Sequence, residues 1–294
     1  MSQASHQLLL FEAQLSRIVN VASVPQRSPF RYPGGKTWLV PRIRRWLKNK
    51  ISEFIEPFAG GIISLTVAAE DLAEHVTMVE LDDQVAAVWR TIIGNDDGKW
   101  LANKIADFDL THESLQHILE SKARTVRDKA FQTIIKNRTH HGGILAPGSS
   151  PLKKGEGGKG IRSRWYAETL KKRILDIVSI RTHITFIEGD GIEVIKQNAH
   201  RADAVFFVDP PYTVAGKKAG RRLYRHSEID HEELFDVISN VTGDFLMTYD
   251  GADEVRKLAE RHGLDTELVA MKNTHHAEMT ELLIARNLDW ARSA

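Results

Sequence analysis

From residue 30 onward, short apolar runs alternate with segments of helical periodicity, and this alternation restricts the possible folds more than any other feature of the chain. The runs that predict strands are residues 51–55, 75–80, 184–187, 204–208, 245–249, 267–271 and 281–285. Helices are predicted at residues 83–93, 192–197, 231–240 and 253–262, and another one ends near residue 69. Strands that alternate with helices are typical of an α/β fold with a doubly wound, mostly parallel sheet.

Two parts of the chain depart from this alternation. Residues 111–180 contain helical stretches around a loop at 142–160, which is rich in Gly, Pro, Ser and Lys and longer than a routine connection. We therefore expect a core domain of residues 29–110 and 181–294, interrupted by a mainly helical domain of residues 111–180. Apolar residues at helical spacing also predict an N-terminal helical extension over residues 1–28: Leu8, Phe11, Leu15, Ile18 and Val19.

The charge of the chain is unevenly distributed, although the formal net charge is only +1. Residues 121–173 hold 14 Lys and Arg against 3 Asp and Glu, so the rest of the chain carries a net charge of −10. Such an asymmetry favours a polyanionic partner, and the alternative is a solvated, lysine-rich insertion. His140, His141, Trp165 and Tyr166 lie in the same region, where bases can stack beside neutralised phosphates.

Composition excludes several classes of protein. The chain has no cysteine, so a disulfide framework, a thiol nucleophile and a cysteine-based zinc site are ruled out. No apolar run approaches the roughly 18 to 20 residues that span a bilayer, so we expect no membrane association and a cytoplasmic location. The histidine pairs at 140–141 and 275–276 lack further ligands at suggestive spacing, so no metal is expected.

The strongest chemical signal is the turn Asp209-Pro210-Pro211-Tyr212, directly after the apolar run at 204–208. Open α/β sheets bind ligands where the strands end, and this turn places an acid there. The two prolines remove backbone donors and leave carbonyl oxygens that need a donor. An exocyclic amino group fits, since Asp209 and the Pro210 carbonyl can accept its two hydrogens while Tyr212 stacks on the ring. The alternative is an acidic turn with structural prolines.

Two glycine-containing turns point to a bound nucleotide. Glu56-Pro57-Phe58-Ala59-Gly60-Gly61 follows the first strand, where glycines let a ligand approach the backbone. Glu80 ends the next strand, where an acid can accept the ribose hydroxyls of an adenosine-containing cofactor. In the segment at 30–36, Lys36 follows Gly34 and Gly35 and could neutralise a ligand carboxylate, although a plain turn is an equal alternative.

Together these motifs resemble the Dam-like, D12 class DNA adenine N6-methyltransferases, whose cofactor elements precede the target-recognition domain and whose Asp-Pro-Pro-Tyr element follows it. The resemblance runs from residue 30 to about residue 287. It includes Gly189-Asp190, similar to the segment that contacts the adenine ring of the cofactor, and the tail at 280–284, similar to a late family strand.

The resemblance implies a Rossmann-like catalytic domain, a target-recognition domain at 111–180, and base flipping of double-stranded DNA with S-adenosylmethionine as methyl donor. A cognate restriction enzyme is a further implied partner. The catalytic residues would be Asp209, Pro210, Pro211 and Tyr212. The cofactor would be bound by Tyr32, Gly34, Lys36, Glu56, Pro57, Phe58, Gly60, Glu80, Asp190 and Asp209. Contacts with DNA are expected from Lys136, Arg138, Arg162, Arg164, Lys171, Lys172, Lys217, Arg221 and Arg222.

The chain departs from the family pattern at two cofactor positions. Ile62 stands where the family usually has a glycine, and Gly191 stands where it usually has an aromatic residue. The basic domain also lacks the patterns of GATC-specific members, so no target sequence can be transferred. The alternatives are an RNA adenine or DNA cytosine-N4 methyltransferase, and a nucleic-acid-binding protein whose catalytic core has decayed.

Overall fold

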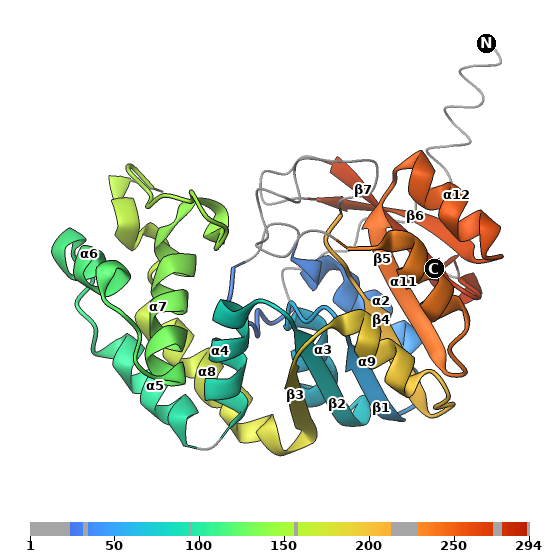
Figure 1. The fold of residues 1–294 in the computed structure, drawn as a ribbon, viewed down its shortest axis with the longest axis horizontal. Coiled ribbons are helices and arrows are strands. Elements are labelled where there is room, and N and C mark those ends of the chain that lie inside the picture. The colour runs from blue at the N-terminus through green and yellow to red at the C-terminus, as the bar shows by residue number, and fades with distance from the viewer. Residues whose placement is uncertain are drawn as a thin grey trace, which may run out of the picture.

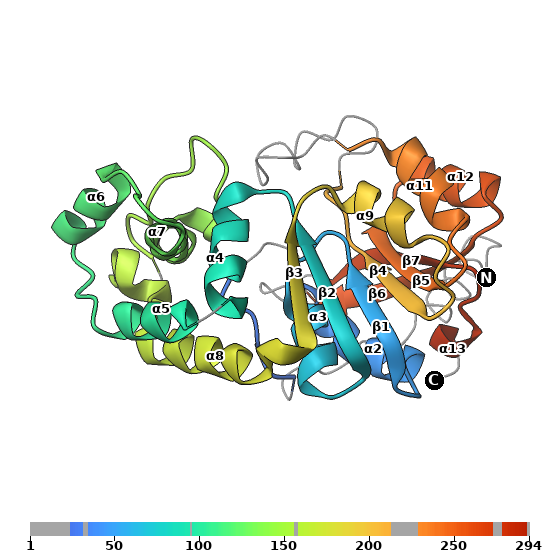
Figure 2. The same ribbon diagram turned by 60° about the horizontal axis from the view of Figure 1, so that its bottom comes forward.

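The computed structural model describes residues 24–31, 35–94, 96–155, 158–212, 229–272 and 278–292. Most of the predicted N-terminal extension therefore lies outside the described residues. The fold is a single seven-stranded sheet flanked by helices, with a group of helices at one end (Figures 1 and 2). None of the helices in the described ranges has the length and apolarity that crossing a membrane requires.

The sheet is mostly parallel, as the alternation predicts. The strands are β1 (Ile51–Glu56), β2 (Ala73–Glu80), β3 (Ile184–Glu188), β4 (Ala204–Val208), β5 (Asp244–Asp250), β6 (Asp265–Lys272) and β7 (Glu278–Ala285). Their order is β3-β2-β1-β4-β5-β7-β6, and only the pairs made by β7 are antiparallel. Strands β2 and β3 are added on one side of β1, and strands β4 and β5 on the other. The boundary between β1 and β4 is therefore the topological switch point, where open α/β sheets bind their ligands.

Both faces of the sheet are covered by helices, because successive strand residues alternate between two apolar cores. Phe54 belongs to one core, together with α2 (Val40–Trp46), α3 (Ile62–Ala69) and α4 (Asp83–Ile93). Ile55 belongs to the other, together with α9 (Gly191–Asn198), α11 (His231–Ser239) and α12 (Asp253–Arg261). This doubly wound arrangement confirms the predicted α/β class. The short helices η1 (Lys36–Leu39) and α13 (Asp289–Arg292) lie near the ends of the chain.

The helices at one end form what we call the helical lobe: α5 (Asp97–Ala106), α6 (His112–Glu120), α7 (Val126–Thr139) and α8 (Ala167–Ile180). Thr111 and Thr125 begin α6 and α7 with reciprocal capping boxes, which satisfy free N–H groups of the first turn. The lobe adjoins α4 beside edge strand β3 (Figure 2), and α5, which precedes the predicted boundary at residue 110, packs against α8.

The long connection between α7 and α8 has structure of its own. His140 and Pro151 form an isolated β-bridge, and short helical turns follow at η2 (His141–Gly143) and η4 (Gly160–Arg164). Leu152 donates its backbone N–H to the carbonyl of Thr139, so the loop folds back onto the end of α7. The predicted long loop is thus anchored to the lobe at its start.

Candidate active site at the carboxyl edge of the sheet

Acidic residues mark the carboxyl ends of the parallel strands. β1 ends at Glu56, β2 at Glu80, β3 at Glu188 and β5 at Asp250, while Asp209 follows β4 directly. These strands run in the same direction, so their ends meet at one edge of the sheet. The residues predicted from separate motifs therefore come together at the switch point between β1 and β4.

The carboxylate of Asp209 is held by one of its two oxygens. Oδ1 accepts hydrogen bonds from the Tyr212 hydroxyl at 2.9 Å and the Thr248 hydroxyl at 2.7 Å, and it pairs with Lys36 Nζ at 3.1 Å. Among the described residues, no side chain donates a hydrogen bond to Oδ2, and 23% of the Asp209 side chain is exposed. The network fixes the orientation of the carboxylate while one oxygen stays available as an acceptor.

Lys36 lies between two carboxylates. Besides Asp209, its ammonium contacts Glu281 Oε2 at 3.4 Å, and only 8% of the lysine side chain is exposed. Sequence reasoning suggested that Lys36 neutralises a ligand carboxylate, whereas in this structure its charge is already paired within the protein. Lys36 Nζ also lies 5.1 Å from the centre of the Tyr212 ring, a distance suited to a cation–π contact.

Glu281 is a member of the site that the sequence motifs did not identify. It lies on β7, whose antiparallel pairing places Glu281 opposite Asp250 at the carboxyl end of β5. The pKa of Glu281 is raised to about 7, mainly by burial; the ammonium of Lys36 opposes the shift, and the negative charge of Asp209 adds to it. The one available signal was an acid within an otherwise apolar strand, Glu281-Leu282-Leu283-Ile284.

Two aromatic rings pack together beside Asp209. Tyr212 stacks on Tyr249, with ring centres 5.6 Å apart and planes inclined by 22°. The Tyr249 hydroxyl is 2.9 Å from His231 Nδ1 at the start of α11, which holds the second ring in place. Burial and the nearby carboxylates raise the pKa of Tyr212 well above its usual value, so its phenol remains a neutral donor to Asp209.

The turn after β1 combines a buried acid with two different glycines. Glu56 is 2% exposed, and its Oε2 accepts the backbone N–H of Ser64 at 3.0 Å in the first turn of α3. A Cβ atom at Gly60 would meet no atom within 4 Å, so the backbone there borders open space. Gly61 has φ of 81°, and a Cβ atom there would lie 2.5 Å from Trp89. Gly60 therefore leaves room for a ligand. At position 61, glycine is required because any side chain would collide with Trp89.

Glu56 and Glu80 are acids with raised pKa values. Burial raises the pKa of Glu56 to about 7, and the charge of Asp209 adds to this effect. Burial likewise raises the pKa of the half-buried Glu80 to about 8, and the charges of Asp82 and Glu56 add to it. Glu80 Oε1 accepts the backbone N–H of Asp82 at 2.8 Å, which fixes the carboxyl at the end of β2.

We expect Glu56→Gln to make the stability of the protein less dependent on pH. Between pH 4.5 and about 7 the unfolded chain has released the Glu56 proton while the folded protein retains it, so wild-type stability falls as the pH rises through this window. Glutamine keeps the acceptor for Ser64 and removes the titration. Urea unfolding should show equal stabilities near pH 5 and a variant more stable by roughly 1 to 3 kcal/mol near pH 8. Parallel curves for the two proteins would contradict the raised pKa.

The other predicted cofactor residues occupy different positions. Asp190 caps α9, since its Oδ1 accepts the backbone N–H groups of Ile192 at 2.8 Å and Glu193 at 3.4 Å. A Cβ atom at the neighbouring Gly191 would lie 2.2 Å from the Pro57 carbonyl, so the turn after β1 and the start of α9 are in contact. Phe58 packs against the core on the α9 side of the sheet. Tyr32 and Gly34 lie outside the described residues.

The predicted DNA-binding residues fall into three groups. Arg138 is only 6% exposed and its Nε donates to the Pro29 carbonyl at 3.1 Å, so the predicted surface contact with DNA does not agree with its burial. Lys136 donates to the Leu145 carbonyl at 2.6 Å. Arg162, Arg164, Lys171 and Lys172 lie on η4 and α8, while Lys217, Arg221 and Arg222 lie outside the described residues.

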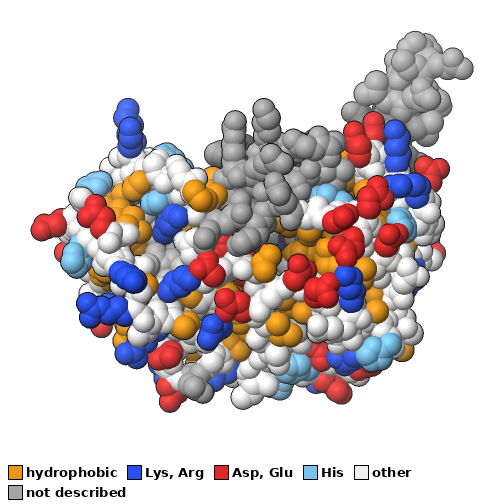
Figure 3. All heavy atoms as spheres, viewed as in Figure 1, with side chains coloured by type: hydrophobic (Ala, Val, Ile, Leu, Met, Phe, Trp, Pro, Cys, Tyr) orange, Lys and Arg blue, Asp and Glu red, His pale blue; other side chains and the backbone are white. Residues whose placement is uncertain are grey.

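In Figure 3, Lys and Arg side chains are scattered over the helical lobe, and Asp and Glu gather over α11 and α12.

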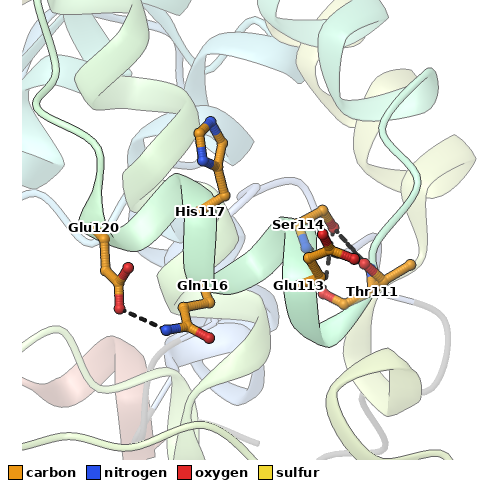
Figure 4. A pocket seen from close by; sticks show the side chains of 6 residues that line it. All are labelled: Thr111, Glu113, Ser114, Gln116, His117 and Glu120. Carbon is orange, nitrogen blue, oxygen red and sulfur yellow. Dashed lines mark hydrogen bonds between the residues drawn. The ribbon is translucent and has the colours of Figure 1, made fainter.

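A surface pocket on α6 is separate from this site (Figure 4). It is lined by Thr111, Glu113, Ser114, Gln116, His117 and Glu120, all from one short helix and its cap. The hydrogen bonds drawn there are the Thr111–Ser114 capping box and the Gln116–Glu120 pair, which stabilise the helix itself. Within the described ranges, no three metal-ligating side chains lie together.

Comparison with solved structures gave matches of low sequence identity. A Pyrococcus horikoshii protein proposed to be an RNA methyltransferase matches with a TM-score of 0.37 and 10% identity, covering 97% of this chain and 96% of that chain. A Geobacter sulfurreducens methyltransferase matches with a TM-score of 0.39 and 11% identity, covering 96% of each chain. Precorrin-6y C5,15-methyltransferase from Geobacter metallireducens matches with a TM-score of 0.34 and 12% identity, covering 87% of this chain and 93% of that chain. No curated protein matches the chain significantly.

A comparison with family models gave a match over residues 32–142. The matched residues include Lys36, Glu56 and Glu80 from the site and part of the helical lobe, while Asp209 and Glu281 lie beyond them. The match supports methyltransferase activity. Over residues 32–142 the chain is similar to the D12 class N6 adenine-specific DNA methyltransferases, which confirms the resemblance predicted from its motifs.

Proposed function

We propose that the chain is a site-specific DNA methyltransferase that transfers a methyl group from S-adenosylmethionine to the N6 amino group of adenine. The observation that carries the proposal is the arrangement of Asp209. Lys36, Tyr212 and Thr248 all contact its Oδ1, and no described side chain donates a hydrogen bond to Oδ2. A carboxylate that is fixed by one oxygen and open at the other is suited to accept a hydrogen from a substrate amine.

The carboxyl edge of the sheet fits S-adenosylmethionine. The open space above Gly60 permits a ligand to lie against the turn between β1 and α3. Glu80, at the end of the adjacent strand, can accept both hydroxyls of a ribose. Pro57 and Phe58, from the same turn as Gly60, would also help to hold the cofactor. When bound, S-adenosylmethionine would supply a methyl group made electrophilic by its sulfonium.

Asp209 and Pro210 would make the adenine amine a better nucleophile. The lone pair of this nitrogen is delocalised into the ring, so the amine is planar and reacts poorly. Acceptance of its two hydrogens by the Asp209 carboxylate and the Pro210 carbonyl favours a pyramidal nitrogen and stabilises the positive charge that develops on it. The ring of Tyr212, which packs on the buried Tyr249, can hold the base in position.

A target adenine in a duplex must leave the base stack to reach Asp209. Extrusion costs a few kcal/mol, and contacts with the phosphate backbone can offset this cost. The net charge of +11 over residues 121–173, from 14 basic and 3 acidic residues, places suitable cations in and around the helical lobe. The charge distribution thus supports DNA as the substrate.

The proposal is tested by incubating the protein with unmethylated DNA and labelled S-adenosylmethionine, followed by digestion to nucleosides. We expect label in N6-methyladenine, at positions that share a sequence. An unmethylated RNA of equivalent sequence serves as the second arm. Label in N4-methylcytosine, or in RNA and not in DNA, would replace the proposed substrate. Cofactor binding without any transfer to nucleic acid would contradict the proposed reaction.

We expect Glu80→Ala to weaken S-adenosylmethionine binding by roughly 1 to 3 kcal/mol, the usual cost of leaving buried hydrogen-bonding partners without their acceptor. Isothermal calorimetry measures the effect. Glu188→Ala is a matched control, because Glu188 is the direct neighbour of Glu80 at the end of β3 but pairs with Arg90 on the surface. We expect the control to bind the cofactor like the wild type. Equal affinities for all three proteins would contradict the assignment of Glu80.

A further inference from the structure

One acid at the carboxyl edge of the sheet has no role in the reaction proposed above: Glu281 of β7. Its Oε2 lies 3.4 Å from Lys36 Nζ and 3.4 Å from the Tyr212 hydroxyl. The same two groups contact Asp209 Oδ1, at 3.1 Å from the ammonium and 2.9 Å from the hydroxyl. Lys36 and Tyr212 therefore bridge the carboxylates of Asp209 and Glu281.

The two bridging groups differ in what they can give to the second carboxylate. A phenol has one hydrogen, and the shorter of the two Tyr212 contacts is the one with Asp209. An ammonium has three hydrogens and a positive charge, so Lys36 can interact with both acids at once. The main interaction of Glu281 in this network is therefore its ion pair with Lys36.

Glu281 adds a surplus negative charge to the network. Asp209 alone is enough to balance the ammonium of Lys36, so two ionised carboxylates leave the three groups with a net negative charge. Only 6% of the Glu281 side chain is exposed, and burial is the main cause of its raised pKa. Because burying a second carboxylate costs stability, the need to pair Lys36 does not explain an acid at position 281.

The surplus charge acts on Asp209 through Lys36. An ammonium that is shared by two carboxylates neutralises each of them less than an ammonium that is paired with one. With Glu281 ionised, Asp209 keeps more of its negative charge for the target amine, on which positive charge develops during transfer. The contact with Glu281 also holds Lys36 Nζ in place, and Lys36 in turn helps to fix Oδ1 of Asp209.

We propose that Glu281 is a positioning residue for methyl transfer, which shares the charge of Lys36 and thereby keeps the Asp209 carboxylate oriented and negatively charged toward the target amine. The proposal rests on the proposed function, because it assigns a role within the same reaction. It predicts that Glu281 affects the rate of transfer and not the binding of the cofactor or of DNA.

Glu281→Gln is the sharpest test, because glutamine keeps the size of the side chain and an acceptor oxygen for Lys36 but has no charge. At pH 8 most of the wild-type Glu281 is ionised, and we expect the variant to lower the single-turnover rate with unmethylated DNA about tenfold. The affinities for S-adenosylmethionine, measured by calorimetry, and for a DNA duplex, measured by fluorescence anisotropy, should change less than about twofold.

Glu267→Gln is the matched control. Glu267 lies on the neighbouring strand β6, where it is opposite Leu283 of β7. Its side chain is 16% exposed and pairs with Arg292 at 3.1 Å, so it is a largely buried, ion-paired glutamate outside the Lys36 network. We expect this variant to transfer methyl groups at the wild-type rate.

The pH dependence separates the charge of Glu281 from its packing. Glutamine resembles the protonated acid, so the wild-type protein should exceed the variant mainly above the raised pKa of about 7. We expect the ratio of wild-type to Glu281→Gln rates to rise from about two near pH 6 to about ten near pH 8. The titrations of Glu56 and Glu80 are present in both proteins and cancel in this ratio.

The surroundings of Glu281 are the same in both proteins. Among the described residues, the charged or titratable groups that face it are Lys36 of η1, Asp209 and Tyr212 after β4, and Asp250 opposite it on β5. The β6 residue opposite it, Val269, is apolar. A change in the ratio of rates with pH therefore reports the charge of Glu281.

Thermal unfolding completes the test. Removal of a surplus buried charge should leave the melting temperature of Glu281→Gln at pH 8 equal to or above that of the wild type. A lower melting temperature, with the rate and both affinities reduced in proportion, would show a structural role and overturn the inference. So would a ratio of rates that does not change with pH, in a wild-type protein that methylates DNA, which leaves the proposed function intact. A wild-type protein that methylates no nucleic acid would contradict both.

Discussion

Asp209→Ala is expected to lower the rate of methyl transfer about 10²- to 10³-fold while leaving the fold and most of the cofactor affinity intact. The loss follows from removing one of two acceptors that stabilise the charge developing on the amine, by analogy with the loss of an oxyanion-hole donor. Asp209 is partly exposed and follows a strand whose own residues build the core, so its removal opens no apolar cavity. The rate is measured under single-turnover conditions with unmethylated DNA.

Asp209→Asn separates the charge of the carboxylate from its shape. Asparagine keeps one acceptor oxygen, but the Tyr212, Thr248 and Lys36 donors that converge on Oδ1 in the wild type compete for it. We expect a rate between those of the wild type and the alanine variant. Asp203→Ala, just before β4 in a surface pair with Arg201, controls for the loss of an acid next to the same strand. Wild-type rates for both Asp209 variants would show that the active site lies elsewhere.

The order of strands and helices could be predicted from the sequence because each element carries a local signal. The run at 204–208 coincides with β4, and the run predicted at 75–80 is the final part of β2. Asp209 and the acids at 56 and 80 follow apolar strands, so a parallel sheet necessarily brings them to one edge. The main acids of the site could therefore be predicted from two local properties: an apolar strand typical of a parallel sheet, and an acid at its carboxyl end.

Glu281 and Thr248 could not be placed in this way because their positions depend on pairing between distant segments. Thr248 lies inside β5 and reaches Asp209 from the neighbouring strand. Glu281 reaches Lys36 only because β7 inserts antiparallel between β5 and β6. The periodicity of a strand predicts its existence and its buried faces but not its neighbours.

Arg138 shows the same limit for the basic residues. A basic residue near the end of a helix in a positively charged region is typical of a solvated phosphate contact. The segment at 28–31 crosses this helix end and covers Arg138 with the carbonyl of Pro29, which no local pattern predicts. The local net charge of the sequence predicts the region in which DNA contacts are proposed. Which basic residues of that region are buried and which are exposed can be seen only in the tertiary structure.

Gly191→Ala is expected to destabilise the protein by about 1 to 3 kcal/mol, the usual cost of overpacking. Helix propensity alone predicts the opposite sign, because Gly191 begins α9 and alanine favours helices over glycine by roughly 1 kcal/mol. The added Cβ atom would lie 2.2 Å from the carbonyl oxygen and 2.9 Å from the carbonyl carbon of Pro57. These are backbone atoms, so no side-chain rotation relieves the contact and the turn itself must move. Denaturant unfolding measures the difference.

The same contact explains why this chain has glycine where the family usually has an aromatic residue. A larger side chain at 191 requires the Pro57 turn to lie further from α9, so in this chain the turn and the helix are fitted to each other. Because Gly60 lies in that turn, Gly191→Ala should also weaken cofactor binding.

Gly189→Ala is the matched control. Its Cβ atom would meet only the Ile187 side chain, at an ordinary 3.6 Å, and the hydrogen bond from the backbone N–H of residue 189 to the Glu80 carbonyl is retained. We expect a change within about 0.5 kcal/mol for Gly189→Ala. Equal stabilities for the two variants would show that the Pro57 turn yields freely, and the shape of the cofactor edge would then not depend on residue 191.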